Sequence, residues 1–281
     1  MKVFVTALNS GSNGNCYYVG NDREAVLIDA GISCRETEKR MKRLELSMDK
    51  VKAIFISHEH SDHVRGVHRI SKKYNLPVYI TPGTLKNSPL EENNPLHVKL
   101  VPYEHVQIGN LQVTAFPKFH DAGDPQSFVV GYKELCIGVF TDIGIPCEHV
   151  IKHFQSCHAA FLETNYDATM LVEGNYPYYL KQRISSDNGH LSNDQALELF
   201  CQHKPAFMSH IFLSHISKEN NDLAMVHDLF NAHAGDVEVV LTSREREIPV
   251  YEITVEEIPA ESLFRKINSL SEKSQLKIAY D

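Results

Sequence analysis

Short apolar runs separated by turn signals fill the first third of the chain. Five of these runs are short and β-branched enough to predict strands, at residues 3–8, 16–20, 25–31, 52–57 and 77–81. The Asn13-Gly14 pair between the first two favours a hairpin turn. Helical spacing of apolar positions predicts helices at 34–46 and 64–75, with Met41 facing inward.

The middle of the chain is β-rich, and its last part is mainly helical. Hairpin-like apolar segments occupy residues 98–119, 126–144 and 159–164. After residue 165, amphipathic patterns predict three helices, at 176–185, 192–203 and 219–234. They alternate with expected strands at 206–215, 237–243 and 249–253. Strands with helices over both faces indicate a layered α/β sandwich spanning residues 1–259, followed by a tail or appended helix at 260–281.

Composition narrows the class of protein. The 281 residues include 42% hydrophobic positions, which suffices for one sizeable core. The chain has no run of about 18 apolar residues and starts with a strand-like segment instead of a signal peptide, so we expect a cytoplasmic protein without membrane contact. Six scattered cysteines fit reduced thiols. A net charge of −8 disfavours a broad basic surface for nucleic acid but leaves room for a local basic groove.

One predicted strand runs directly into the segment HEHSDH, which holds four potential metal ligands: His58, His60, Asp62 and His63. His58 and His60 lie two apart and project to the same side, whereas the turn after them lets the other two face a second point. This geometry suits two adjacent metal ions better than one. Imidazole and carboxylate ligands suit zinc, and also iron or manganese. Glu59 points away on the same alternation, toward the surface or behind the ligands.

Further candidate ligands follow other predicted strands. His120, Asp142 and His215 each come directly after an apolar strand. An isolated histidine at such a place is usually a hydrogen-bonded structural residue. Three such positions in a chain that already holds the HEHSDH segment favour one shared metal site instead.

Together these residues carry a resemblance. HxHxDH after a strand, with Asp29 upstream and the three strand-end ligands downstream, resembles the metallo-β-lactamase superfamily over roughly residues 1–255. The resemblance implies a four-layer αββα sandwich with the site at one edge of its two sheets. It implies two divalent metal ions bridged by Asp142, one held by His58, His60 and His120 and the other by Asp62, His63 and His215. Asp29 then orients the histidine loop and is not a ligand.

The superfamily hydrolyses β-lactams, thioesters, lactones and phosphodiesters, and one branch reduces oxygen, so the fold alone does not decide the reaction. The oxygen-reducing branch resembles HxExDH, with a carboxylate at the place of His60, which disfavours that chemistry here. The absence of a secretion signal and the bridging Asp142 disfavour penicillin hydrolysis. Thioester hydrolysis stays open.

Two later residues direct the choice toward phosphodiesters. Glu163 ends a predicted strand and His190 precedes a helix, and the pair resembles the HEAT and GH(S/T) segments of tRNase Z nucleases. That resemblance implies a histidine, oriented by the glutamate, that protonates the leaving oxygen, while Asp62 and Asp142 hold the metals and the attacking hydroxide. The alternative is a structural histidine at a helix entry. Ser192 fits a capping box and needs no functional role.

A wider set of segments resembles the YycJ/WalJ family of bacterial proteins, which is associated with 5′→3′ double-stranded DNA exonuclease activity. In chain order they are SGSNGNCYYVG, LIDAG, SHEHSDHVRG, HDAGDP, ETNYD, GHLSN and LSHISKENN. The family implies a DNA substrate, a role in DNA repair and two divalent ions, zinc or manganese. Tyr166 departs from the pattern, because other members carry histidine there, so no role of that histidine is carried over.

Local chemistry suggests substrate contacts, each with a plain structural alternative. Ser12 and Asn13 offer small side chains and backbone N–H groups to a phosphate, or simply form an Asn-Gly turn. Lys181 and Arg183 lie near His190 in sequence and can meet a backbone phosphate, or simply face solvent. A small-molecule hydrolase acting on a thioester or cyclic phosphodiester stays open, as does a non-catalytic metal-binding scaffold. The oligomeric state is left undetermined.

Overall fold

The first sheet is built from the N-terminal third of the chain and one strand that returns near residue 251. We describe residues 1–255 of the protein from a computed structural model. The strand order is β14 (Tyr251–Thr254), β1 (Lys2–Asn9), β2 (Cys16–Gly20), β3 (Ala25–Ile28), β4 (Val51–Phe55), β5 (Val78–Ile80) and β6 (His97–Lys99). From β14 to β3 the neighbours are antiparallel, and from β3 to β6 they are parallel. The carboxyl ends of β3 and β4 therefore share one edge of the sheet.

The second sheet has the same division into an antiparallel and a parallel half. Its order is β13 (Glu238–Leu241), β12 (His210–Ser214), β11 (Ala159–Glu163), β10 (Leu135–Phe140), β9 (Gln126–Tyr132), β8 (Leu111–Pro117) and β7 (His105–Ile108). Strands β7 to β10 pair antiparallel and β10 to β13 pair parallel. Because two antiparallel steps separate β8 from β10, strands β8, β10, β11 and β12 all point the same way.

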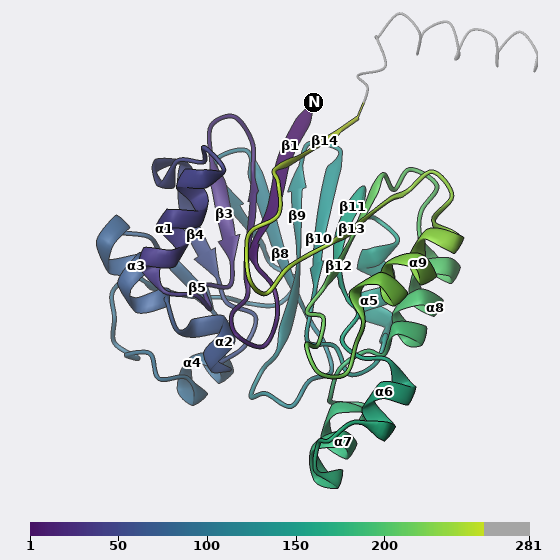
Figure 1. Cartoon of the computed structure of the whole chain (residues 1–281). Helices are drawn as coiled ribbons and strands as arrows, with labels where there is room; N and C mark the ends of the chain where they lie inside the picture. Colours follow the sequence, from purple (N-terminus) through teal and green to yellow (C-terminus); the bar gives the residue numbers. More distant parts are fainter. Residues whose placement is uncertain (256–281) are drawn as a thin grey trace, which may run out of the picture.

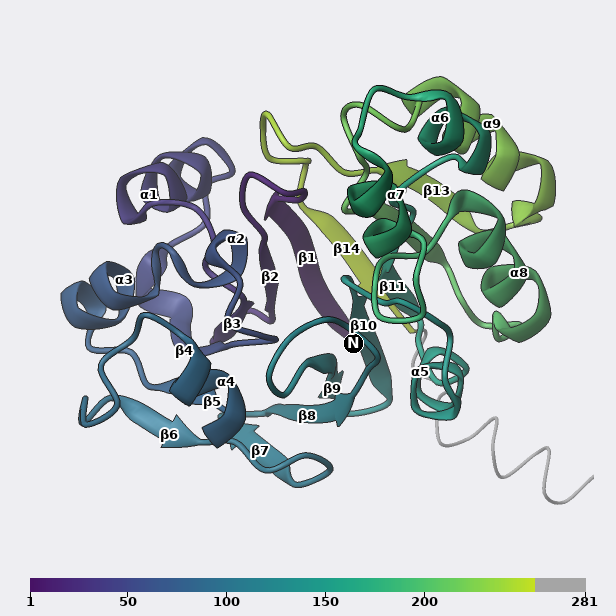
Figure 2. The same cartoon turned by 90° about the horizontal axis from the view of Figure 1, so that it is seen from below.

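Helices cover the outer face of each sheet, so the four-layer αββα sandwich expected from the sequence is confirmed (Figure 1). On the side of the first sheet lie α1 (Cys34–Arg43), a 3₁₀ turn (Met48–Lys50), α2 (Ser61–Val64), α3 (Val67–Tyr74) and α4 (Pro82–Asn87). On the side of the second sheet lie α5 (Glu148–Phe154), α8 (Asn193–His203) and α9 (Leu223–Ala234). Two short helices, α6 (Ala168–Glu173) and α7 (Tyr178–Ile184), project from the body of the sandwich, and we call them the arm (Figures 1 and 2).

The central core lies between the two sheets and is rich in aromatic rings. Tyr17 of the first sheet meets Phe161 of the second at a ring-centroid distance of 5.0 Å, and Phe161 stacks on Phe212 at 4.5 Å. Phe55 and Phe128 form a second contact across the sheets at 5.9 Å. All five side chains are buried. Aromatic pairs of this kind add to the burial of apolar area, so they fix how the two sheets face each other.

The structure differs from the sequence-based expectation mainly in its helices. The helix expected over 64–75 is divided into α2 and α3 at Gly66. The Gly66 amide donates to the Ala30 carbonyl, and a Cβ at position 66 would lie 2.0 Å from the Ile32 carbonyl oxygen. This close approach of two backbones explains the break. Helices α4, α5 and α6 were not anticipated, since each has fewer than eight residues and little periodicity.

None of the helices among residues 1–255 has the length and apolar character needed to cross a membrane. The expectation for residues 260–281 lies outside the described part of the chain, and the domain limit at residue 259 stays a prediction.

The contacts of Phe161 across the sheets lead to a stability prediction. Phe161→Ala should lower the free energy of unfolding by about 3–5 kcal/mol, because it removes a buried ring and leaves a cavity between the sheets. Urea denaturation monitored by circular dichroism measures this change. Phe207→Ala is the control, since Phe207 is 53% exposed and should cost about 0.5 kcal/mol or less. Equal losses for the two variants would contradict this account of the core.

Candidate metal centre

Seven potential ligands converge where the carboxyl ends of strands from both sheets meet. Four of them, in the HEHSDH segment, follow β4, and one each follows β8, β10 and β12. In chain order the seven are His58, His60, Asp62, His63, His120, Asp142 and His215. The chain thus brings together every residue that the sequence nominated as a ligand. Helix α2, which contains Asp62 and His63, lies at the edge of the sandwich from which the arm projects (Figure 1).

The first group of donors consists of His58, His60 and His120. His58 Nε2 lies 3.0 Å from His60 Nδ1, and His120 Nε2 lies 3.4 Å from the same His60 atom. His58 and His120 are buried, whereas His60 is partly exposed. Three imidazole nitrogens therefore face one point at the rim of the site.

The second group consists of Asp62, His63 and His215. Asp62 Oδ2 lies 3.5 Å from His63 Nε2 and 3.8 Å from His215 Nε2. Asp142 stands between the two groups. Its Oδ2 lies 3.2 Å from His63 Nε2, and its Oδ1 lies 3.9 Å from His120 Nε2 in the first group.

Donor atoms at these separations fit bound cations. Ligands held tetrahedrally at zinc–nitrogen bond lengths lie about 3.3 Å from one another, close to the spacings within both groups. His215 Nε2 is buried and makes no hydrogen bond within the described residues, although buried polar atoms are normally paired. The nitrogen and carboxylate set suits zinc or manganese. The residues present therefore fit divalent metal ions.

Hydrogen bonds at the far side of the rings orient the first-sheet histidines. Asp29, buried at the end of β3, accepts from His63 Nδ1 at 2.7 Å and from the Ser57 amide and hydroxyl at 2.8 Å each. The Ser57 hydroxyl also contacts His58 Nδ1 at 2.9 Å. With Nδ1 engaged in this way, Nε2 of both rings points to the shared site, which is how carboxylates commonly orient metal-binding histidines. Asp29 itself lies behind the ligands, as the resemblance implied.

The second-sheet histidines are oriented in the same manner. His120 Nδ1 donates to the Gly189 carbonyl at 3.0 Å, and His215 Nδ1 donates to Glu163 Oε1 at 2.9 Å. Asn165 adds contacts to His215 Nδ1 at 3.3 Å and to its carbonyl at 2.8 Å. Each ring is therefore held at one nitrogen while the other faces the site.

Backbone strain accompanies the site at three strand ends. Asp29, Asp142 and His215 have φ values of 60°, 55° and 55°, in the left-handed region that residues other than glycine rarely adopt. Such conformations persist where the surrounding structure enforces them, typically at functional sites. Gly31 shows a related constraint, because an added Cβ would lie 1.6 Å from the Asp62 carbonyl oxygen.

Burial and neighbouring charge act differently on the individual potential ligands. At His63 and His215 burial lowers the pKa, but the charge of Asp142 outweighs it and raises the pKa, for His215 to about 10, so a metal ion binding there would displace protons. Burial lowers the pKa of His58 well below its usual value and that of His120 to about 3. For the Asp142 carboxyl, burial raises the pKa, but the charge of His215 and other histidines outweighs it and holds the pKa well below its usual range. Neutral imidazole and ionised carboxylate are the forms that bind metal.

Glu163 and His190 lie in direct contact beside the two groups. Glu163 Oε1 accepts from His190 Nδ1 at 2.8 Å, and Oε2 accepts from the Ile143 amide at 2.7 Å. Burial raises the pKa of Glu163, but the charge and hydrogen bond of His190 lower it to about 2. The His190 side chain is 15% exposed and lies 3.9 Å from Asp142 Oδ1. A carboxylate thus orients a reachable imidazole next to the donor cluster.

The four residues nominated for substrate contact lie in different places. Ser12 and Arg183 line a cavity of about 180 Å³ that also includes His190 and His215. Arg183 Nε donates to Asp121 Oδ2 at 2.5 Å. Asn13 Nδ2 donates to the Arg244 carbonyl. Lys181 Nζ donates to the Val172 carbonyl within the arm. Neither Asn13 nor Lys181 is among the residues lining this cavity.

Sequence reasoning missed several residues that hold the ligands in place. Ser57 links Asp29 to His58, and Asn15 Nδ2 contacts His63 Nε2 at 3.0 Å and Asp62 Oδ2 at 3.3 Å. No pattern separates these from ordinary polar residues near turns. Glu59, expected at the surface or behind the ligands, accepts from the Gly123 amide at 2.7 Å and so holds the loop that carries His120. The capping box at Ser192 is present.

A family model described as "Beta-lactamase superfamily domain" matches residues 24–216. The exodeoxyribonuclease YycJ of Bacillus anthracis is 33% identical over 228 residues, covering 79% of this chain and 85% of that protein. The exodeoxyribonuclease WalJ of Streptococcus pneumoniae is 30% identical over 261 residues, covering 88% and 96%. Among solved structures, the metallo-beta-lactamase fold protein YhfI of Bacillus subtilis superposes with a TM-score of 0.69 at 13% identity, over 90% of this chain and all of that one.

The contacts of Asp29 predict how strongly the site binds metal. Asp29→Asn should weaken metal affinity about 10- to 100-fold, because the amide cannot accept all three hydrogen bonds that position Ser57 and His63. Competition with a chromogenic chelator measures the affinity. Asp228→Asn is the matched control, since that side chain is 84% exposed. Unchanged affinity in Asp29→Asn would show that Asp29 does not orient the ligands.

Proposed function

Because the chain belongs to the metallo-β-lactamase superfamily and, within it, to the YycJ/WalJ exonuclease family, we propose that it degrades double-stranded DNA in the 5′→3′ direction. The chain is a metal-dependent hydrolase of phosphodiester bonds. To this the proposal adds double-stranded DNA as the substrate, the 5′→3′ direction of degradation, and the presence of two metal ions, zinc or manganese. One ion would be held by the first group of donors and the other by the second group, with Asp142 between them.

The observation that carries the proposal is the contact between Glu163 and His190. Cleaving a natural phosphodiester releases an alkoxide, which is a poor leaving group and needs a proton. A histidine beside the donor groups, held by a buried carboxylate at 2.8 Å, is suited to that task. A hydrolase of activated esters has less need of such an acid. The pair therefore supports phosphodiester substrates over thioesters.

Different side chains would bind the metal ions, donate the proton and contact the DNA. When bound, divalent metals at such a site neutralise charge on a phosphate and lower the pKa of water. Glu163 accepts a hydrogen bond from His190 Nδ1–H and stabilises the imidazolium, which leaves the Nε2 proton available for the leaving oxygen. His190 Nδ1 also lies 3.9 Å from Asp142 Oδ1, so the ring of the proposed acid stands beside the donors that would hold the metal ions. Ser12 and Arg183, which line the cavity beside His190, are the proposed contacts to the DNA backbone.

The direction of cleavage can be tested with end-labelled duplex DNA. With zinc or manganese bound, we expect a 5′ label to leave at once as a mononucleotide and a 3′ label to pass through successively shorter fragments. The same duplex with and without a 5′ phosphate tests recognition of that end. Elemental analysis of the loaded protein should give two metal ions per chain. Release of the 3′ label first, or hydrolysis of small esters without cleavage of DNA, would contradict the proposal.

The proton-donor role of His190 gives a second prediction. His190→Ala should retain its metal ions but lose about 10²- to 10⁴-fold in kcat on natural DNA. It should lose far less on bis(p-nitrophenyl) phosphate, whose leaving group needs no proton. His68→Ala, which removes an exposed histidine on α3, is the matched control. Wild-type turnover of natural DNA by His190→Ala would show that another group supplies the proton.

A further inference from the structure

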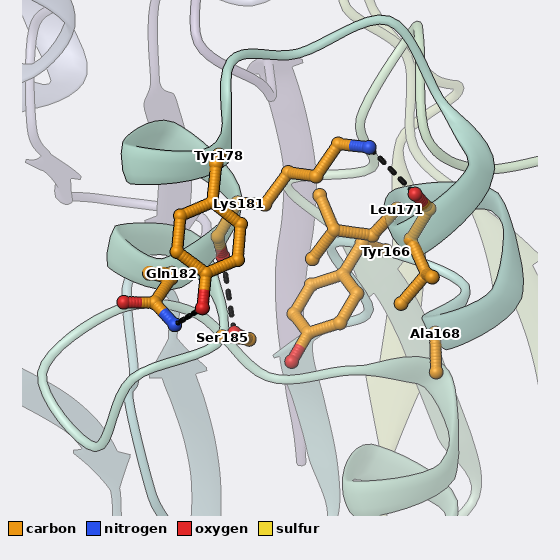
Figure 3. Close-up of a pocket in the computed structure, with 8 residues that line it drawn as sticks. Tyr166, Ala168, Leu171, Tyr178, Lys181, Gln182 and Ser185 are labelled. Carbon is orange, nitrogen blue, oxygen red and sulfur yellow. Dashed lines mark hydrogen bonds between the residues drawn. The ribbon is translucent and has the colours of Figure 1, made fainter.

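The arm contains a cavity that the metal centre does not use. It has a volume of about 380 Å³ and lies between α6 and α7, above Tyr166 (Figure 3). Tyr166 lies on the loop between β11 and α6. Its side chain is buried in a small cluster with Leu171 and Ile184, and it joins neither group of potential ligands. We call this cavity the arm pocket.

Two aromatic rings border the arm pocket. Tyr178 and Tyr166 both line it, and Figure 3 shows the Tyr178 ring standing apart from Tyr166 and Leu171 with open space between them. Tyr178 is 74% exposed, although it is a large ring, and its hydroxyl accepts from Gln182 Nε2, which holds it in position. A flat opening between an exposed ring and an apolar floor suits a planar aromatic ligand.

Charge at the arm pocket favours an anionic ligand. No acidic residue lines it, although the chain carries 36 acidic side chains and a net charge of −8. One cation, Lys181, does line it, and its ammonium donates to the Val172 carbonyl at 2.6 Å. A planar ring next to an anionic group describes a nucleotide. Aromatic side chains combined with lysine are the usual means of holding unpaired bases and their phosphates.

Helix α7 forms the wall between the arm pocket and the metal centre. Lys181 and Ser185 line the arm pocket, whereas Arg183 and Ile184 line the cavity that includes His190. The Ile184 carbonyl accepts from the His190 amide at 2.8 Å, which joins α7 to the loop of the proposed acid. A helix is about 10 Å across, and one strand of DNA advances about 3.4 Å per nucleotide. The arm pocket is therefore a few nucleotides from the metal centre.

We propose that the arm pocket binds one unpaired base of the DNA strand, a few nucleotides from the phosphate that is cleaved. The base stacks on Tyr178, and its phosphate lies near Lys181. This inference rests on the proposed nuclease function and adds to it a separate binding site for a base outside the duplex. Any base can stack on an aromatic ring, so the arm pocket would bind the DNA strand without sequence preference.

The chain offers a matched pair of variants for the test. Tyr178 and Tyr179 are neighbours on α7 with the same exposure of 74%, but only Tyr178 lines the arm pocket. The probe is a duplex with an unpaired 5′ end and phosphorothioate linkages that prevent cleavage. We expect Tyr178→Ala to weaken its binding to the metal-loaded protein about tenfold, as measured by fluorescence anisotropy. Tyr178→Phe keeps the ring and should bind like wild type, as should Tyr179→Ala. Equal losses for Tyr178→Ala and Tyr179→Ala would overturn the inference.

An abasic nucleotide, moved one position at a time through the first six nucleotides, identifies the base that enters the arm pocket. At one position the abasic nucleotide should weaken the binding of DNA to the wild-type protein about tenfold. The same nucleotide should not weaken binding to Tyr178→Ala any further, because both changes remove the same stacking contact. If no position shows this coupling while wild type cleaves the DNA, the arm pocket inference is wrong and the nuclease function stands. If wild type neither binds nor cleaves DNA, the proposed function itself fails.

Discussion

The close approach of potential ligand atoms in a largely buried site is the constraint on which the rest of this structure depends. His58 Nε2 and His60 Nδ1 lie 3.0 Å apart, and the carboxylates of Asp62 and Asp142 both lie near His63. Without a cation between them, such atoms would separate or take up protons. The fold prevents separation by fixing the rings of His58, His63, His120 and His215 from behind. Asp29 and Glu163, at the ends of strands in different sheets, provide two of these fixed contacts.

Strand direction explains why these fixed contacts meet. The parallel pair β3 and β4 in one sheet, and the co-directional strands β8, β10, β11 and β12 in the other, all end at the same edge of the sandwich. The aromatic contacts of Phe161 and Tyr17 then hold the two sheets face to face. The left-handed backbone at Asp142 and His215 turns the chain sharply where each strand ends. Strain at these positions is tolerated because buried strands on both sides hold the turn in place.

The sequence predicted which side chains converge because their signals are local. His58 and His60 follow a strand at a spacing that metal sites require, and His120, Asp142 and His215 also come directly after apolar runs. Residues whose roles depend on tertiary contacts could not be predicted. Ser57 and Asn15 look like ordinary polar residues until the strands of the first sheet are assembled. The helix break at Gly66 depends on the backbone of Ala30 and Ile32, more than 30 residues upstream. The arm pocket depends on how α6 packs against α7. In the sequence, the only sign of it was that Tyr166 departs from the pattern of the family that the chain resembles.

The division of donors between the two sheets has a consequence for how the enzyme is made. Residues 1–99 contain the whole HEHSDH segment, yet they complete neither group, because His120 and His215 belong to the second sheet. A nascent chain emerging from the ribosome therefore cannot assemble a hydrolytic centre until β12 has paired with β11. Metal binding by both proposed groups would thus report that synthesis has passed residue 215 and that both sheets have closed. For a metal-dependent hydrolase of phosphodiester bonds, this would keep unfinished chains inert.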